Sequence, residues 1–357
     1  MKKVYFTQIN NLIADAIFLP LSVAYIWEYC KTQVTDWELG DIFFERESVE
    51  DYLKKIDNPD ILALSTYVWN WDITCQLARA VKKKYPNCKI VMGGPQVPFK
   101  QSWLEDNPDL CDIIVTYAGE RAFAEILKGN YTYPGVMTKE SYTPPKPDRE
   151  LNDIPSPYLS GLMDSLMQPG KQYSAIIETN RGCPYSCSFC DQQDLYYNKI
   201  AMFDYDRVIG EIDWIVKNKI DFLYIGDSNV GMFNRDVDFI RHIAKRRNET
   251  GYPRQIDYST AKQQPKRIVE LGEILNKEAK IRRGVTIALQ SMNPKTLKAI
   301  KRINLANEKL EQIVSDYNKA GVDNYCELIV GLPEETLDSW IEGIGKILEL
   351  GSDHALT

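Results

Sequence analysis

Histidine is almost absent from this chain of 357 residues, which contains only His242 and His354. A histidine-rich zinc site and a Ser-His-Asp triad both need imidazole groups, so the composition disfavours both. A positive net charge is also missing, because 43 Lys and Arg stand against 50 Asp and Glu, for a formal charge of −7. That sign disfavours general binding to the phosphates of nucleic acids.

Long apolar runs are missing as well. No uninterrupted run in the sequence reaches the ~18 to 20 apolar residues that a membrane-spanning helix needs. The apolar stretch at residues 12–27 follows two lysines, as in a signal peptide, but Asp15 and Pro20 interrupt it. We therefore expect a cytoplasmic protein without a membrane segment.

The first part of the chain alternates between apolar segments typical of strands and amphipathic segments typical of helices. Strands are expected at residues 4–9, 41–44, 61–66, 89–92 and 112–116, and helices at residues 20–31, 49–56, 72–85 and 121–127. This pattern predicts an α/β fold with a doubly wound, flavodoxin-like parallel sheet of about five strands. Such sheets bind ligands beyond the carboxyl ends of their strands.

The loops at three of those strand ends carry small and polar residues. They are Ser65, Thr66 and Tyr67, then Gly93, Gly94, Pro95 and Gln96, and finally Gly119 and Glu120. Paired glycines let the backbone approach a ligand closely, but they also suit tight strand-to-helix turns. The nearby Trp69 and Trp71 fit either a buried core or the wall of a cofactor site.

Residues 129–172 are rich in proline and tyrosine and have few periodic apolar residues, which is typical of a linker. A second β/α series follows. Its strands are expected at residues 173–179, 222–225, 255–259, 283–289 and 324–330, and its helices at residues 206–218, 237–247, 265–275, 294–301 and 307–320. Residues 353–357 fit the start of a sixth strand. The sequence thus predicts domains at residues 1–128 and 173–357.

Three of the eight cysteines cluster after the first strand of this second series. Cys183, Cys187 and Cys190 follow a CxxxCxxC spacing. Disulfides would leave one of these sulfurs unpaired, and tetrahedral zinc needs a fourth ligand, yet no Cys or His follows before His242. Three thiolates on a [4Fe–4S] cluster leave one iron open to an exogenous ligand, which indicates chemistry rather than structure.

With Phe189 before its last cysteine, this loop resembles the CxxxCx(aromatic)C motif of the radical S-adenosylmethionine (radical SAM) superfamily. The resemblance implies a partial (β/α)6 barrel, here cut short at its sixth strand. It also implies that the open iron binds SAM, whose reductive cleavage yields a 5′-deoxyadenosyl radical. The SAM contacts implied by the family's motifs are Phe189, Gly226, Asp227, Ser228, Gln290, Ser291, Ile329, Gly331 and Glu334.

Two of these motifs depart from the family pattern. Gly226-Asp227-Ser228 stands where the family has a GGE-like motif that holds the SAM amino group, and we expect Asp227 to take that role. Glu327 replaces the first glycine of the GxIxGxxE pattern.

The first domain then resembles the cobalamin-binding domain of one radical SAM subfamily, with cobalamin held by the three loops named above. Because residues 1–241 contain no histidine, imidazole from this domain cannot ligate the cobalt. The resemblance implies a cobalamin-dependent methyltransferase that acts on a small-molecule or peptide substrate and takes electrons from a flavodoxin or ferredoxin. A degenerate domain that has lost cobalamin is an alternative.

Two other functions stay open. A methylthiotransferase would need a second cluster in the first domain, where Cys30, Cys75, Cys88 and Cys111 are available. A noncatalytic protein that binds cobalamin or SAM, as one subunit of a split enzyme, would fit the missing sixth strand, which a second chain could complete.

Overall fold

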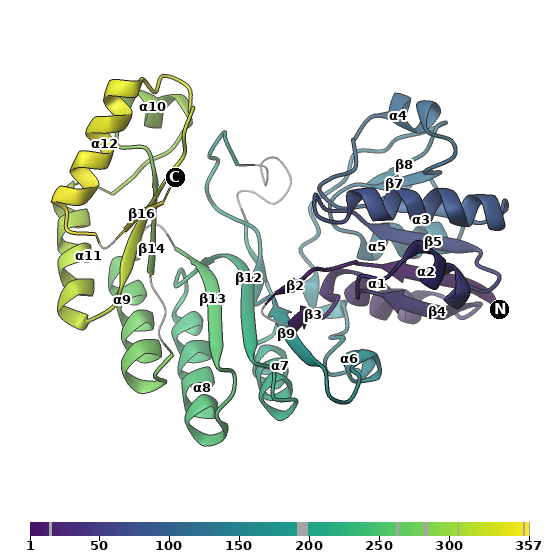
Figure 1. The fold of residues 1–357 in the computed structure, drawn as a ribbon, viewed down its shortest axis with the longest axis horizontal. Coiled ribbons are helices and arrows are strands. Elements are labelled where there is room, and N and C mark those ends of the chain that lie inside the picture. The colour runs from purple at the N-terminus through teal and green to yellow at the C-terminus, as the bar shows by residue number, and fades with distance from the viewer. Residues whose placement is uncertain are drawn as a thin grey trace. The chain divides into compact units, whose positions relative to one another are not determined.

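The computed structural model describes residues 1–13, 16–190, 199–261, 264–281, 285–305, 307–352 and 354–356 (Figure 1). The chain forms two compact units, Met1–Ala175 and Ile176–Thr357, and the division falls inside strand β9 (Gln172–Ile177). Four residues of the predicted strands lie outside the described residues, namely Arg283, Gly284, Asp353 and Thr357, and so does Asp15.

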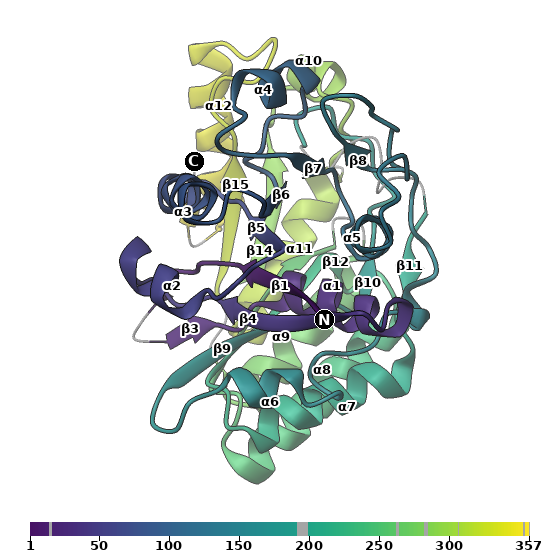
Figure 2. The same ribbon diagram turned by 90° about the vertical axis from the view of Figure 1, so that its right-hand side faces the viewer.

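A six-stranded sheet forms the centre of the first unit, in the order β4-β1-β5-β6-β7-β8 (Figure 2). Its five parallel strands are β1 (Lys2–Thr7), β4 (Trp37–Phe43), β5 (Ile61–Ser65), β6 (Lys89–Gly93) and β7 (Ile113–Val115). Numbered along the chain, these five follow the order 2-1-3-4-5 of flavodoxin-like folds. The predicted parallel sheet is therefore confirmed.

Helices cover both faces of this sheet (Figure 2). They are α1 (Leu21–Gln33), α2 (Val49–Lys55), α3 (Trp71–Lys84) and α5 (Glu120–Leu127). Successive strand residues point to opposite faces. Tyr5 packs in the core with residues of α2 and α3, whereas the Phe6 ring lies 6.2 Å from the ring of Trp27 on α1 and 5.1 Å from that of Phe123 on α5. The doubly wound arrangement follows from these contacts.

Residues 129–172, expected as a linker, belong to the first compact unit. They contain β8 (Val136–Met137), which pairs antiparallel with β7, the 3₁₀ helix η1 (Leu151–Asp153) and α6 (Leu162–Leu166). Arg121 on α5 fastens this segment, with Nε 2.8 Å from Asp148 Oδ2 and Nη2 2.9 Å from Asp153 Oδ1. A two-residue strand has no periodicity for a sequence pattern to reveal. Helix α4 (Gln101–Asp106) was also missed, and its six residues make fewer than two helical turns.

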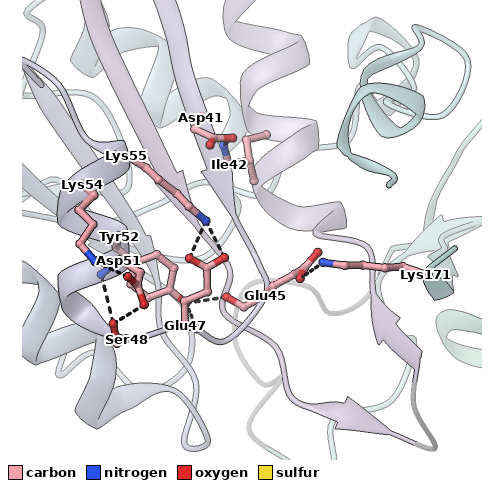
Figure 3. Close-up of polar contacts among 10 residues, drawn as sticks. All are labelled: Asp41, Ile42, Glu45, Glu47, Ser48, Asp51, Tyr52, Lys54, Lys55 and Lys171. Atoms are coloured by element: carbon pink, nitrogen blue, oxygen red, sulfur yellow. Dashed lines mark hydrogen bonds and ion pairs between the residues drawn. The ribbon is translucent and has the colours of Figure 1, made fainter. Parts of the chain in front are cut away.

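Ion pairs fill the segment that follows β4 (Figure 3). Lys55 Nζ lies 2.5 Å from Glu47 Oε2, and Lys171, just before β9, lies 2.5 Å from Glu45 Oε2. Because these pairs are partly exposed, each contributes only about 0–1 kcal/mol. Two further short strands, β2 (Leu12–Ile13) and β3 (Ala16–Phe18), were not predicted.

The second unit continues the strand and helix alternation from the end of β9. Its strands are β12 (Phe222–Val230), β13 (Gln255–Thr260), β14 (Val285–Gln290), β15 (Asn324–Leu328) and β16 (His354–Leu356). Its helices are α7 (Tyr205–Lys217), α8 (Asn234–Thr250), α9 (Pro265–Glu273), the π-helix η2 (Ile274–Glu278), α10 (Pro294–Ala299), α11 (Asn307–Ala320) and α12 (Leu337–Glu349).

These strands pair in parallel as β12 with β13 and as β14, β15 and β16 in order. The Thr260 hydroxyl donates to the Thr286 carbonyl at 2.7 Å and so links β13 to β14. The α/β fold is confirmed, while closure into a partial barrel stays a prediction. Strand β16 lies where the sixth strand was expected, and α12 was missed. Among the described residues, every helix is too short or too polar to cross a membrane.

Candidate functional site

The three clustered cysteines lie on one loop that is tied at its base. Strand β10 (Asn180–Arg181) pairs antiparallel with β11 (Ala201–Met202), so the chain leaves and returns side by side. Cys183 and Cys187 are buried, and Cys190 is half-buried. The fold therefore constrains the loop that carries the thiols.

Asp227, on β12, anchors the base of this loop. One carboxylate oxygen accepts hydrogen bonds from the backbone N–H groups of Thr179 at 2.7 Å and Asn180 at 3.3 Å. The other accepts from Asn180 Nδ2 at 2.7 Å and from the Thr179 hydroxyl. Burial raises the pKa of Asp227 to about 7, although these hydrogen bonds favour its charged form. A carboxylate has about four acceptor sites, so none remains for the SAM amino group that we expected Asp227 to bind.

The Gly226-Asp227-Ser228 motif lies within β12, in a bulge. Regular pairing with β13 stops at Ile225 and resumes at Val230. A bulge re-aims the side chains of the extra residues. Gly226 is exposed, Ser228 is half-buried and Asn229 is buried, so the motif lies inside a strand and not at a strand end as predicted.

Two side chains that sequence reasoning missed reach the buried cysteines. Asn229 Nδ2 lies 3.3 Å from Cys183 Sγ, within hydrogen-bonding distance of sulfur. The Arg302 guanidinium, just after α10, interacts with Cys187 through a hydrogen bond and through charge. No local motif could signal these contacts, because Asn229 and Cys183 are 46 residues apart in the chain.

The residues predicted to contact SAM from β14 and β15 lie at the ends of these paired strands. The Ile329 N–H donates to the Gln290 carbonyl at 2.9 Å and so joins the two strand ends. The Ser291 hydroxyl donates to the Glu335 carboxylate. The remaining predicted contacts, Gly331 and Glu334, are exposed in the loop after β15.

In the first unit, Asn70 fastens the carboxyl ends of β1 and β5. Its Nδ2 donates to the Ile9 carbonyl at 3.1 Å and to the Ser65 carbonyl at 3.0 Å, and its Oδ1 accepts from the Tyr67 N–H at 2.8 Å. The strand order reverses between β1 and β5, which is the point where flavodoxin-like sheets bind ligands. Sequence reasoning found this loop but missed Asn70.

Gly94 explains the glycine pair after β6. Its φ is +105°, and a Cβ there would lie 2.4 Å from the Thr66 carbonyl oxygen. The Thr66 N–H donates to the Gly93 carbonyl at 2.7 Å, so the two loops share backbone contacts. Backbone packing thus requires Gly94, while Pro95 and Gln96 are exposed beyond it.

Helix packing accounts for the third predicted loop. Glu120 is buried in the first turn of α5, and a Cβ on Gly119 would lie 2.7 Å from Ile26 Cδ1. The aromatic residues of the first loop divide into two sets. Trp71 packs in the core, whereas the Tyr67 and Trp69 rings stack at 4.5 Å with Trp69 44% exposed.

Comparison with known families identifies both units. Residues 177–345 match the model of the radical SAM superfamily, and residues 12–127 match the model of the B12 binding domain. The chain belongs to the radical SAM superfamily, in the group with a B12-binding domain. These two domains imply a [4Fe–4S] cluster, SAM and cobalamin as cofactors.

Two curated relatives match along almost the whole chain. The cobalamin-dependent radical SAM methyltransferase TokK of Streptomyces tokunonensis is 34% identical, over 99% of this chain and 54% of TokK. The 2-(S-pantetheinyl)-carbapenam-3-carboxylate methyltransferase of Streptantibioticus cattleyicolor is 33% identical, over 98% of this chain and 54% of the relative. The chain therefore spans about half the length of these relatives.

Solved structures of radical SAM proteins share the fold. The radical SAM methyltransferase TsrM from Kitasatospora setae superposes with a TM-score of 0.71 at 17% identity, covering 99% of this chain and 72% of TsrM. The cobalamin-dependent radical SAM enzyme OxsB gives a TM-score of 0.69 at 17% identity, covering 97% of this chain and 52% of OxsB. At such identities the likeness supports the fold alone.

The thiol loop offers donors whose chemistry fits an iron–sulfur cluster. Among the described residues, no three Cys, His, Asp or Glu side chains gather closely enough to hold one metal ion. A single zinc ion draws each thiolate to about 2.3 Å, whereas a four-iron cluster spreads its thiolates over a wider space. The donors are soft thiols, two of them already contacted by Asn229 and Arg302, and Phe189 is half-buried in the same loop.

The cysteines of the first unit do not suit a second cluster. Cys30 lies on α1 and Cys75 on α3, while Cys88 and Cys111 precede β6 and β7, and all four are buried. Burial raises the pKa of Cys30, that of Cys75 to about 11 and those of Cys88 and Cys111 to about 12. Metal ligation needs thiolates, and these environments favour the protonated thiol.

Proposed function

We propose that this chain is the SAM-cleaving and cobalamin-binding part of a cobalamin-dependent radical SAM methyltransferase. The observation that carries the proposal is the cysteine loop, tied at its base by Asp227 and contacted at two sulfurs by Asn229 and Arg302. When bound, the cluster and SAM supply a carbon radical, and cobalamin supplies a methyl group. In this proposal the cobalamin-binding and radical SAM domains run over residues 1–128 and 173–357, and residues 129–172 fold with the first of them.

The chain's own residues bind and orient these groups. In our proposal Cys183, Cys187 and Cys190 hold three irons, and Asp227 keeps the loop in place through Thr179 and Asn180. The residues proposed to contact SAM are Phe189, Gly226, Ser228, Gln290, Ser291, Ile329, Gly331 and Glu334. The hydrogen bond between Ile329 and Gln290 supports these assignments, because it holds the ends of β14 and β15 together where the nucleoside of SAM would bind.

The proposed cobalamin site is the carboxyl edge of the first sheet around β5 and β6. The residues proposed there are Ser65, Thr66, Tyr67, Gly93, Gly94, Pro95 and Gln96, with Gly119 and Glu120 supporting them from α5. The reversal of strand order beside β5 and the exposed Trp69 ring support this choice.

A carbapenam is the first substrate to test, because one curated relative is named as a carbapenam methyltransferase. A flavodoxin or ferredoxin would supply the electron. The described cysteines form no disulfide, which fits the reducing cytoplasm in which such donors act.

Anaerobic incubation of the reconstituted protein with SAM and dithionite tests the proposal. Release of 5′-deoxyadenosine, together with transfer of labelled methyl from SAM to cob(I)alamin or a carbapenam, is expected. The triple variant C183A/C187A/C190A should release none. Binding of SAM or cobalamin without 5′-deoxyadenosine would contradict catalysis and favour a noncatalytic binding subunit.

A further inference from the structure

We propose that Asn229 and Arg302 are positioning residues that raise the reduction potential of the cluster by stabilising its sulfur ligands in the reduced state. This inference rests on the proposed function, because it takes Cys183 and Cys187 as cluster ligands.

The Asn229 contact gives one sulfur a hydrogen bond. Asn229 is 5% exposed, and its Nδ2 lies 3.3 Å from Cys183 Sγ. A thiolate accepts but cannot donate, so the amide must turn its N–H toward the sulfur. Among the described residues, Asn229 Oδ1 is buried without a hydrogen-bond partner. The amide therefore keeps its N–H at the sulfur although its oxygen lacks the hydrogen bond that buried amide oxygens normally have.

Arg302 brings a positive charge to the second sulfur. The residue is only 6% exposed, and burial lowers the pKa of its guanidinium, while the charge and hydrogen bond of Cys187 oppose that effect. Its Nε donates to Asn304 Oδ1 at 2.8 Å, and its Nη2 donates to the Ala288 carbonyl. These two bonds fix the plane of the guanidinium. Among the described residues, no carboxylate lies within ion-pairing distance of Arg302, and the carboxylate of Glu327 on β15 attracts it only over a longer distance.

A buried cation without a carboxylate partner is costly unless an anion fills the site. The three thiolates that hold a [4Fe–4S] cluster carry negative charge, and one-electron reduction adds one more negative charge to the cluster. The segment before Arg302 also holds the loop itself, because the Ser188 N–H donates to the Ile300 carbonyl at 3.0 Å.

The direction of the effect follows from charge. The cluster takes one electron from a flavodoxin-class donor, and no bond to protein forms or breaks. A nearby cation and an N–H donor both stabilise the more negative, reduced form, and hydrogen bonds to sulfur are among the factors that set cluster potentials. Removing either group should therefore make the cluster harder to reduce.

A redox titration followed by EPR tests this without SAM, cobalamin or substrate. In Asn229→Asp and Arg302→Gln, the reduction equilibrium should shift toward the oxidised cluster by about tenfold, which is about 59 mV for one electron. Arg302→Lys keeps the positive charge but loses the planar guanidinium with its several N–H donors. The reduction potential of the cluster in this variant should therefore fall between those of wild type and Arg302→Gln.

Matched controls come from the same unit. Asn324 is buried and its amide donates to Asn318, and Arg267 donates to the carbonyls of Gly231 and Met232. Asn324→Ala and Arg267→Gln should leave the potential unchanged. Asn229→Ala serves as a second variant at this position. If both Asn229 variants unfold, the Arg302 variants alone test whether these side chains raise the reduction potential of the cluster.

The inference is overturned if Asn229→Asp and Arg302→Gln retain about four irons and keep the wild-type potential. That result would leave the proposed function intact. Conversely, if the triple cysteine variant retained its iron, the three cysteines would not be the cluster ligands, and the proposed function itself would be contradicted.

Discussion

Asn180 hydrogen-bonds to both carboxylate oxygens of Asp227, with its backbone N–H 3.3 Å from one and its Nδ2 2.7 Å from the other. The buried side chain of Asp227 thus joins strand β12 to strand β10, which leads into the cysteine loop. This contact places Asp227 behind the loop, where it acts through Asn180 and Thr179.

Asp227 should make stability depend on pH. Its folded pKa of about 7 lies above its ordinary value of 3.8, so the folded state binds the proton more tightly. Its contribution to stability is full below about pH 4 and is lost as the pH rises through 7. Urea unfolding of the apo-protein between pH 4 and 8 should show this loss. The amide introduced by Asp227→Asn cannot ionise, so the curve of that variant should lack the loss. Parallel curves for the two proteins would contradict the assignment.

Replacing the clustered cysteines should remove the iron. Each of Cys183→Ala, Cys187→Ala and Cys190→Ala should lower the iron content from about four per chain toward zero, because three protein thiolates are the minimum for this cluster. Cys326→Ala is the matched control, since Cys326 is a buried cysteine on β15 outside the loop. An iron content of about eight in wild type would instead revive the methylthiotransferase alternative.

Gly94→Ala should weaken cobalamin binding. The added Cβ would meet the Thr66 carbonyl oxygen at 2.4 Å and would strain a backbone with φ of +105°, at a cost of about 2–3 kcal/mol. Gly129→Ala is the control, because Gly129 has φ of +83° but open space around it. Titration of each variant with hydroxocobalamin checks the prediction. Equal affinity in Gly94→Ala and wild type would argue against this loop.

Arg121→Ala should loosen residues 148–153 from α5. The substitution removes ion pairs to Asp148 and Asp153 and a hydrogen bond to the Tyr29 hydroxyl at 2.7 Å, with an expected loss of about 2–3 kcal/mol. Arg79 is exposed, and among the residues that the structure describes its ion pair is with Asp109, so Arg79→Ala should cost less than about 1 kcal/mol. Urea unfolding and limited proteolysis would measure both, and equal losses would contradict the assigned role of Arg121.

The sequence predicted the parts of the fold that carry strong periodicity. Helix α11 was expected at its observed bounds, and β5 and β6 within one residue, because apolar alternation and turn residues mark their ends. Strand β12 was predicted too short, since its apolar pattern breaks at Gly226 while its backbone stays extended to Val230. Helix α12 carries a clear signal, the Thr336 cap before an apolar helical pattern, which sequence reasoning overlooked.

The candidate site was predictable where it is local in sequence. The cysteine spacing and the Gly93-Gly94 pair are short motifs with a direct chemical meaning. Asn70, Asn229 and Arg302 were missed because each has a partner that is distant in the chain, namely Ile9, Cys183 and Cys187, so only the folded topology brings them together. The role of Asp227 was predicted differently for the same reason, since nothing in its neighbourhood reveals Thr179 and Asn180.

The short ribbon of β10 and β11 has a consequence for assembly. Since its two strands pair with each other, the ends of the chain segment that carries the cysteines are brought together when the protein folds. The entropy of closing that loop is therefore lost on folding and is not lost again when iron and sulfide bind.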